Sequence, residues 1–313
     1  MISLAICGAF SLPAKLDIPN LVWQVYNGGM ELKTFDLKSD LLIFMDSNQY
    51  SIEDVSLDTG LPVSTIENIL LGKGGASPLI LECCYQCFHK RGLALNSAKE
   101  EIWLENYGKT LLFHGSKDGL TFITPNGSRS DCDLGPGFYL GESYQTVGLF
   151  VYQYPNSSVY PFLLDESGLK IEKLDCDLSW MIAVAYYRGK IKAFGKHETV
   201  KKVLDRFEGA DVIIAPIADN RMFYVMRQFT EGEITDLEAL HCLSASGLGH
   251  QYVLKSQKAI DHLTSLDRLY ICSTERELFD RNAMERSKVI DAKLKLAKRE
   301  FRGQGNYIED IFG

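Results

Sequence analysis

The chain has 313 residues, 46% of them hydrophobic, and a formal net charge of −8. This length allows one large domain or two ordinary ones, and the apolar fraction is that of a globular protein. The acidic balance excludes a basic field over the whole chain of the kind that holds nucleic acid, although a local basic face stays open. The eight cysteines are scattered in apolar surroundings, which predicts reduced thiols and a cytoplasmic location.

Residues 1–30 form an extension whose role the sequence leaves open. Residues 2–13 are mostly apolar, but no Lys or Arg precedes them and the run is too short to span a bilayer. A signal peptide is therefore the less favoured interpretation. No later stretch is apolar over a membrane-spanning length, so we expect no membrane partner.

Residues 31–107 are predicted to form a small helical module. Ser51 is a typical N-cap residue and acidic residues follow it, as at the start of many helices. We expect helices at 37–45, from Ser51 to a turn at 59–62, at 63–70 and at 77–89, followed by a linking helix at 98–107. The tight turn between the second and third helices gives helix-turn-helix geometry.

The stretch SIEDVSLDTGLPVSTIENILLGKGGASP resembles the phage-repressor type of helix-turn-helix, the XRE or Cro/C1-like family. The resemblance implies a recognition helix near 63–71 and DNA as a partner. Residues 31–92 hold five Lys or Arg against nine Asp or Glu, and the predicted recognition helix has no arginine. Phosphate contacts need cations. The alternative is a docking or dimerisation module that keeps this fold without binding DNA.

Cys84, Cys87 and His89 are close enough in sequence to raise the possibility of zinc. No second pair of ligands has the spacing of a metal site. We therefore predict a helix whose small cysteine side chains pack inward, and no metal site.

Residues 108–270 mix strands and helices, which favours an α+β domain over a doubly wound sheet. Strands are expected at 110–114, 159–164, 211–217 and 251–255, and helices at 143–152, 178–187, 198–207 and 235–244. Neither GxGxxG nor GxxxxGK[ST] occurs, so the sequence carries no Rossmann fingerprint and no P-loop.

Two glycine-containing segments in this domain indicate a ligand site. His114 ends an apolar run and is followed by Gly115, and glycine lets a ligand approach the backbone closely. Residues 135–139 (GPGFY) then present an aromatic side chain. Backbone amides, an imidazole and an aromatic ring suit nicotinamide riboside, which offers an amide, hydroxyl groups and a flat ring.

Residues 113–116 (FHGS), 135–139 (GPGFY) and 251–253 (QYV) resemble the three motifs of ADP-ribosyltransferases. The closest pattern is the His-Tyr-Glu class of diphtheria toxin and the poly-ADP-ribose polymerases. Residues 111–263 are also similar to an uncharacterised bacterial family assigned to that superfamily. The resemblance covers about half of the chain and implies an ADP-ribosyltransferase-like split β-sheet, with NAD as co-substrate.

The resemblance assigns roles to individual residues. His114 would bind a ribose hydroxyl, and the Gly115 backbone would hold the nicotinamide amide, with Ser116 completing this NAD-binding motif. Tyr139 would stack on the nicotinamide ring. Phe150 falls where the family often has the second ring of the sandwich. The structural alternatives are a hydrogen-bonded histidine at 114 and a core tyrosine at 139.

Gln251 falls where the polymerases carry their catalytic glutamate, and this is the main departure from the family pattern. A neutral amide can hydrogen-bond the ribose but gives up a full charge, and electrostatic stabilisation is often the largest catalytic term. We therefore expect mono-transfer, weak glycohydrolysis or NAD binding without turnover. Glu142 and Asp219 are candidate substitutes for the missing carboxylate.

Two further residues near these motifs have open assignments. Arg221 is expected either to reach the NAD diphosphate or the acceptor, or to lie in a salt-bridged turn at 219–221. His250 is expected to point to the opposite side of its strand from Gln251, so it receives no catalytic role.

Residues 271–313 form a C-terminal arm in which 273–302 are amphipathic and predict a long helix. Residues 275–302 hold nine Lys or Arg and six Asp or Glu. We expect this helix to pack back on the body or to pair with another chain in a homo-oligomer. A nucleic-acid contact through its basic end, 293–302, is less favoured.

The leading hypothesis is a cytoplasmic, bacterial, NAD-dependent mono-ADP-ribosyltransferase that modifies a macromolecular acceptor, as a toxin or phage-defence effector. The alternative is a catalytically silent regulator that senses NAD or ADP-ribose and binds DNA through the helical module. A third hypothesis is an interaction scaffold without NAD chemistry.

Overall fold

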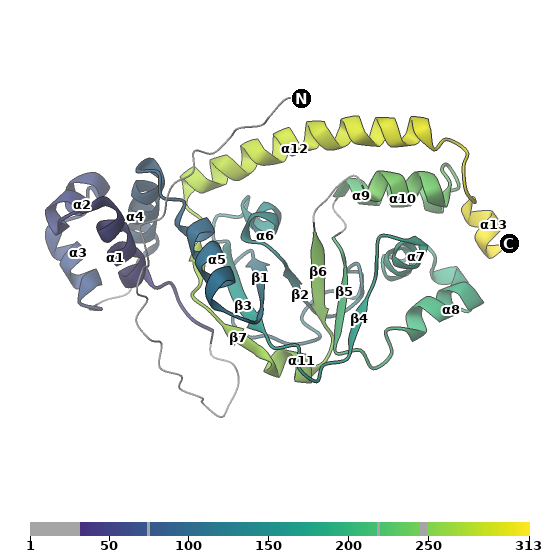
Figure 1. Cartoon of the computed structure of the whole chain (residues 1–313), viewed down its shortest axis with the longest axis horizontal. Helices are drawn as coiled ribbons and strands as arrows, with labels where there is room; N and C mark the ends of the chain where they lie inside the picture. Colours follow the sequence, from purple (N-terminus) through teal and green to yellow (C-terminus); the bar gives the residue numbers. More distant parts are fainter. Residues whose placement is uncertain (1–31, 74–75, 218–219, 245–248) are drawn as a thin grey trace.

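The computed structural model describes residues 32–73, 76–217, 220–244 and 249–313, and for 220–223 the main chain alone. Five N-terminal helices lie beside a mixed sheet, and a long C-terminal helix runs across the top of the view in Figure 1. The chain is therefore a mixed α+β protein, as the sequence predicts. The predicted extension at 1–30 lies outside the described residues.

The module comprises α1 (Leu37–Asn48), α2 (Ile52–Thr59), α3 (Val63–Leu70), α4 (Pro78–Lys90) and α5 (Leu95–Asn106). Local signals fix the helix ends. Ser51 accepts the Asp54 N–H at 3.2 Å and donates its own N–H to the Asp54 carboxylate at 2.8 Å, which caps α2. Gly60 ends α2 with φ at 70°, where glycine is unstrained. The predicted helices are confirmed, except that α5 starts at Leu95 and ends before Tyr107, which is extended.

Apolar side chains from the first four helices fill the core of the module. Cys84 and Cys87 are buried on α4, which confirms that these cysteines pack inward. The seven cysteines in the described ranges are free thiols. The largest contributors to this core are Leu41, Phe44, Val55, Ile66, Tyr85 and Phe88.

The strands form one sheet in the order β4-β5-β6-β2-β1-β3-β7, and β8 also pairs with β3. Only β4 and β5 run parallel among the described pairs. The strands are β1 (Thr110–Ser116), β2 (Phe138–Gly141), β3 (Ser158–Leu164), β4 (Ile171–Lys173), β5 (Val212–Pro216), β6 (His250–Leu254), β7 (Leu263–Ser265) and β8 (Leu269–Tyr270). Strands β2, β4, β7 and β8 were not expected from the sequence, because they are too short to show a clear alternation.

One residue pair joins β1 to β2. Phe113 lies opposite Gly141, whereas β1 pairs with β3 at seven positions and β2 with β6 at four. Beyond that pair, residues 114–116 of β1 and 138–140 of β2 are not paired with each other. The sheet therefore consists of two well-paired halves that meet at a narrow join.

Helix α6 (Tyr144–Val151) packs over this join because two glycines leave room for it. A Cβ on Gly115 would lie 2.9 Å from Val151 Cγ1, and one on Gly141 would lie 2.7 Å from Val147 Cγ2. Both distances are shorter than van der Waals contact, so a side chain at either position would displace α6.

Most of the remaining helices cover the other half of the sheet. They are α7 (Leu178–Tyr187), the 3-10 helix η1 (Lys192–Phe194), α8 (Glu198–Asp205), α9 (Asn220–Thr230) and α10 (Asp236–Ser244). Helix α11 (Gln257–Asp261) packs instead in a core with side chains from both halves of the sheet. Residues 180–185 of α7 are all buried, in a core that also contains Ile213, Ala215 and Val253 of the sheet. Helix α9 already begins at Asn220, so the turn expected at 219–221 is wrong at that residue. Asp219 lies outside the described residues.

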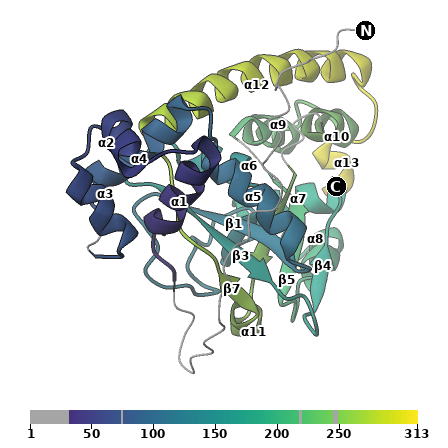
Figure 2. The same cartoon turned by 60° about the vertical axis from the view of Figure 1, so that its left-hand side comes forward.

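Helix α12 (Ser273–Glu300) confirms the predicted C-terminal helix and packs back on the body. It extends from α4 past α6 to α10 (Figure 2). Phe279 occupies the space over Gly148 of α6, where a Cβ would overlap its ring. The chain ends in α13 (Ile308–Phe312), where Phe312 stacks on Phe194 with ring centroids 4.8 Å apart. Within the described ranges, no helix combines the length and the apolar character needed to cross a membrane.

Candidate functional site

The three sequence motifs lie on neighbouring strands. His114 is in β1, Tyr139 is in β2 and Gln251 is in β6. Strand β2 lies between the other two, with Gly141 opposite Phe113 on one side and opposite Gln251 on the other. Segments far apart in the sequence thus meet at the join between the sheet halves.

His114 connects the two halves where they are no longer paired. Its Nδ1 lies 2.8 Å from the main-chain oxygen of Tyr139, and its ring stacks on Phe138 with centroids 4.6 Å apart. Because a carbonyl oxygen can only accept, Nδ1 carries the ring proton and Nε2 is an acceptor. Burial lowers the pKa of His114, although the hydrogen bond to Tyr139 acts in the opposite direction. The imidazole is therefore neutral near pH 7.

The Tyr139 hydroxyl is engaged in the loop that precedes its strand. It donates to the Gly135 carbonyl at 2.7 Å and accepts the Leu134 N–H at 3.0 Å. Burial is the main reason that the pKa of Tyr139 is raised. The hydroxyl is thus unsuited to acid–base chemistry, and the ring is the part of this half-buried side chain that a ligand can use.

Gln251 is buried, and two acceptors hold its amide group. Its Nε2 donates to the Pro216 carbonyl at 3.0 Å and to the Asp133 carboxylate at 3.3 Å. Arg188 binds the same carboxylate, with its Nε at 2.9 Å and a terminal nitrogen at 2.6 Å. Burial raises the pKa of Asp133, whereas Arg188 and Gln251 lower it. Because both acceptors face the amide nitrogen, Oε1 is the acceptor that Gln251 can offer a ligand.

The loop that carries Asp133 is tightly held. Gly135 has φ at 73° and passes so close to the Tyr187 ring that a Cβ would lie 2.5 Å from Cε1. Lys255 Nζ donates to the Leu134 carbonyl at 2.8 Å and also to the Pro136 carbonyl. Burial lowers the pKa of Lys255 to about 8. These contacts fix the main chain on both sides of Gly135.

Residues 110–265, about half of the chain, match the model of a family described as "Protein of unknown function (DUF3990)". This range begins with the first residue of β1 and ends with the last residue of β7. It contains all three motif segments and leaves out the helical module and α12. No curated protein and no solved structure matches the chain.

The other predicted NAD contacts are less closely grouped. Gly115 lies beneath α6, and Ser116 Oγ donates to the Gly119 carbonyl at 2.6 Å. Phe150 is 49% exposed on α6. The side chain of Arg221 lies outside the described residues.

Glu142, one of the two candidate carboxylates, pairs with His250. Its carboxylate accepts the His250 main-chain N–H at 2.8 Å and lies 3.2 Å from Nδ1 of that ring. His250 and Gln251 are successive residues of β6, so their side chains point to opposite sides. Asp219, the other candidate, lies outside the described residues.

Three residues around Gln251 and the Gly135 loop were not expected from the sequence: Asp133, Arg188 and Lys255. Asp133 stands two residues before Gly135 of the second motif, so a carboxylate next to that motif was the available signal. Arg188 and Lys255 gave no such signal, because they reach this loop only through the tertiary fold.

The exposed surface of α3 has no positively charged side chain of its own that would favour DNA binding. Its exposed side chains include Ser64, Glu67 and Asn68, and α3 itself contains no Lys or Arg. Lys73 follows shortly after the helix. DNA binding by this module stays a prediction, with little electrostatic support.

Proposed function

We propose that this protein is an NAD-dependent mono-ADP-ribosyltransferase that modifies a macromolecular acceptor, with residues 108–270 as its ADP-ribosyltransferase-like domain. One observation carries the proposal: His114, Tyr139 and Gln251 come from three neighbouring strands at the join between two sheet halves. The strand register puts the aromatic ring and the primary amide on one face of the sheet, whereas the imidazole stacks on Phe138 on the other face. NAD would contact both faces across the stretch of β1 that β2 does not cover.

In the proposed reaction, the bond between the nicotinamide nitrogen and ribose C1′ breaks, and nicotinamide leaves with the bonding electron pair. A nucleophile of the acceptor forms a new bond to C1′ and gives up its proton to solvent or to a nearby base. The products are nicotinamide, the ADP-ribosylated acceptor and a proton.

His114 would bind a ribose hydroxyl through Nε2, because Nδ1 is occupied by the Tyr139 carbonyl. A neutral ring suits this task. It orients the ribose without adding positive charge beside a carbon that becomes cationic as nicotinamide leaves. The Gly115 main chain and the Tyr139 ring would hold the nicotinamide by its amide and its flat face. Phe150 is the proposed second ring.

Gln251 would accept a second ribose hydroxyl through Oε1 while Asp133 and Pro216 hold its NH₂ group. The Asp133 carboxylate next to this amide is itself paired with Arg188. Among the described residues, neither Asp133 nor Glu142, which pairs with His250, therefore offers the uncompensated carboxylate that the polymerases use. This supports a single transfer rather than chain extension, at a modest rate.

Transfer of label from NAD to macromolecules tests the proposal. The full chain is incubated with cell extract and NAD labelled in its adenylate phosphate, and acid-insoluble label is counted. We expect labelled protein or nucleic acid with the wild type and a loss of at least about 100-fold with His114→Ala. His262→Ala is the matched control, because His262 also bonds a main-chain carbonyl through Nδ1, that of Asp165 at 2.9 Å.

Two results would contradict the proposal: a folded wild type that transfers no label, or equal loss in the two histidine variants. The resemblance to toxin-type enzymes supports a toxin or phage-defence role in the cytoplasm. If NAD binds without transfer, the sensing regulator becomes the better account, and salt-sensitive binding of duplex DNA is then its test.

A further inference from the structure

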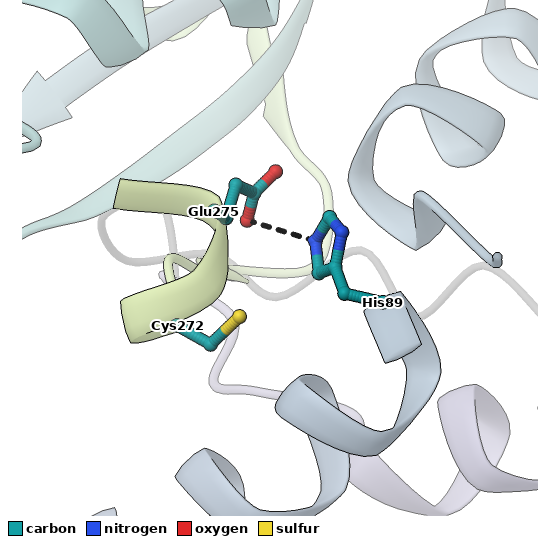
Figure 3. Close-up of side chains that lie close together, drawn as sticks. All are labelled: His89, Cys272 and Glu275. Atoms are coloured by element: carbon teal, nitrogen blue, oxygen red, sulfur yellow. Dashed lines mark ion pairs between the residues drawn. The ribbon is translucent and has the colours of Figure 1, made fainter. Parts of the chain in front are cut away.

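Three side chains with metal-binding atoms meet between the helical module and the start of α12. His89 comes from the last turn of α4, Cys272 directly precedes α12, and Glu275 lies in the first turn of that helix. One ligand atom from each lies within 4.8 Å of the other two. Figure 3 shows the imidazole, thiol and carboxylate directed into the same space.

This group of three is enclosed. Cys272 is fully buried, and the side chains of His89 and Glu275 are 8% and 6% exposed. The Glu275 carboxylate accepts a hydrogen bond from Asn96 Nδ2 at 3.0 Å, while His89 Nε2 stands 3.7 Å from it and is positive only if protonated. A buried carboxylate needs a compensating cation, and a bound metal ion supplies one.

We propose that His89, Cys272 and Glu275 bind a Zn²⁺ ion that fastens the helical module to α12. The inference is independent of the proposed transferase activity. It departs from the sequence-based expectation of no metal site, in which His89 was considered only with Cys84 and Cys87.

Charge and ligand type both favour zinc. An imidazole, a thiolate and a carboxylate are ligands that Zn²⁺ takes in proteins. With Cys272 as thiolate and Glu275 ionised, the two negative charges balance the two positive charges of the ion. Burial raises the pKa of the Cys272 thiol to about 12, although the main-chain groups of Thr274 and Glu275 lower it. Zinc binding would therefore displace the thiol proton.

The ligand atoms of His89, Cys272 and Glu275 would have to move slightly to bind one Zn²⁺ ion. Zinc bonds of about 2.0–2.3 Å set tetrahedral ligand atoms about 3.3–3.8 Å apart. His89 Nε2 and Glu275 Oε2, at 3.7 Å, already satisfy this. The widest pair, at up to 4.8 Å, has to close by about 1 Å, within reach of a side-chain rotation. A water molecule would complete the four ligands, and the Asn96 amide would orient the carboxylate.

The test uses the full chain, freed of metal by a chelator and titrated with Zn²⁺ and separately with Co²⁺. We expect one equivalent of Zn²⁺ to bind with release of about one proton. We also expect a higher Tm and, for Co²⁺, a sulfur-to-cobalt charge-transfer band. Cys272→Ser should lose the band and bind Zn²⁺ at least about 100-fold more weakly, since loss of an outer-shell partner alone costs about 10–100-fold.

Cys84→Ser is the matched control. It removes a different buried thiol, on α4, which does not belong to the group of three. It should keep the stoichiometry and the cobalt band. His89→Gln should keep a cobalt–sulfur band but bind weakly, which tests the site even if Cys272→Ser fails to fold. A wild type that binds no stoichiometric Zn²⁺, or binds Co²⁺ without the sulfur band, overturns the proposal. Equal losses in Cys84→Ser and Cys272→Ser also overturn it.

Discussion

Two histidines lie where distant parts of this chain meet, and their partners differ in kind. His114 faces a neutral main-chain carbonyl at the join between β1 and β2. His89 faces a carboxylate and a thiol where α4 meets α12. The carbonyl fixes one neutral tautomer and leaves a lone pair for a hydroxyl group, whereas a carboxylate and a thiol beside an imidazole form a set of metal ligands.

The two places also differ in how they hold together. The β1–β2 join rests on one residue pair and on hydrogen bonds to main-chain groups. The module is attached instead through buried polar groups: Lys99, which pairs with Asp40 inside the module, also lies 4.0 Å from Asp267, and Asn96 donates to Glu275. We therefore expect substitutions at the join to change activity and substitutions of the buried polar groups to change stability.

The largest expected effect is a loss of stability when the buried ion pair of Asp40 and Lys99 is broken. Lys99→Met would leave Asp40, fully buried and bonded to the Tyr85 hydroxyl, without its cation. We expect unfolding free energy to fall by about 3–5 kcal/mol, measured by urea titration, with nicotinamide release per folded molecule unchanged. Arg91→Met breaks an exposed pair with Asp58 in the same module and should cost much less, because solvent screens that pair. Equal losses of unfolding free energy in Lys99→Met and Arg91→Met would contradict the expected difference between a buried and an exposed ion pair.

The next effect is on activity, at Gln251. Gln251→Glu would place a second carboxylate beside Asp133, and two adjacent carboxylates resist ionising together. We expect the side chain at position 251 to move away from Asp133, and nicotinamide release to fall by about 100-fold because the ribose is then held less well. Adding Asp133→Asn should restore much of it, since an amide can donate to the new carboxylate. No recovery in the double variant would show that the Asp133–Gln251 contact does not govern the site.

A smaller effect is expected from Tyr139→Phe, which distinguishes the role of the Tyr139 ring from that of its hydroxyl. Tyr139→Phe removes the hydrogen bonds with Leu134 and Gly135 and should cost about 1–3 kcal/mol of stability. Nicotinamide release should stay within about threefold of wild type, because the ring remains. Thermal unfolding and initial rates measured on the same sample give both numbers. A large loss of rate with little loss of stability would assign chemistry to the hydroxyl.

The smallest effect is a pH dependence from His114. Its pKa is lowered in the folded protein, so the unfolded chain binds this proton first as pH falls below about 6.5. Stability should therefore decrease with falling pH from about 6.5 down to the folded pKa. Denaturant midpoints at several pH values, compared with those of His114→Gln, isolate this contribution. The variant should lack this part of the pH dependence, and identical profiles would argue against a buried neutral ring.

The helical module was predictable because its signals are local. Ser51 caps α2 through its neighbour Asp54, and Gly60 ends that helix by its own conformation. His114 and Tyr139 were predictable from short motifs. Asp133 and its partners were not, because Arg188 lies 55 residues away in sequence.

The short strands and the group of His89, Cys272 and Glu275 were also not predictable from the sequence. Strand β2 has four residues, too few to show an alternating pattern. His89 and Cys272 are brought together only when α4 packs against α12. Sequence spacing pointed to nearby cysteines on the same helix, and the partners came instead from the other end of the chain.

Release of nicotinamide from NAD by the full chain, with cell extract as the source of acceptor, tests the central claim most directly. Wild type, Tyr139→Phe and Tyr139→Ala would be compared at equal folded concentration. The account predicts release by the wild type, nearly equal release by Tyr139→Phe and at least a 100-fold loss, roughly, in Tyr139→Ala. No release by a folded wild type, or undiminished release by Tyr139→Ala, would contradict it.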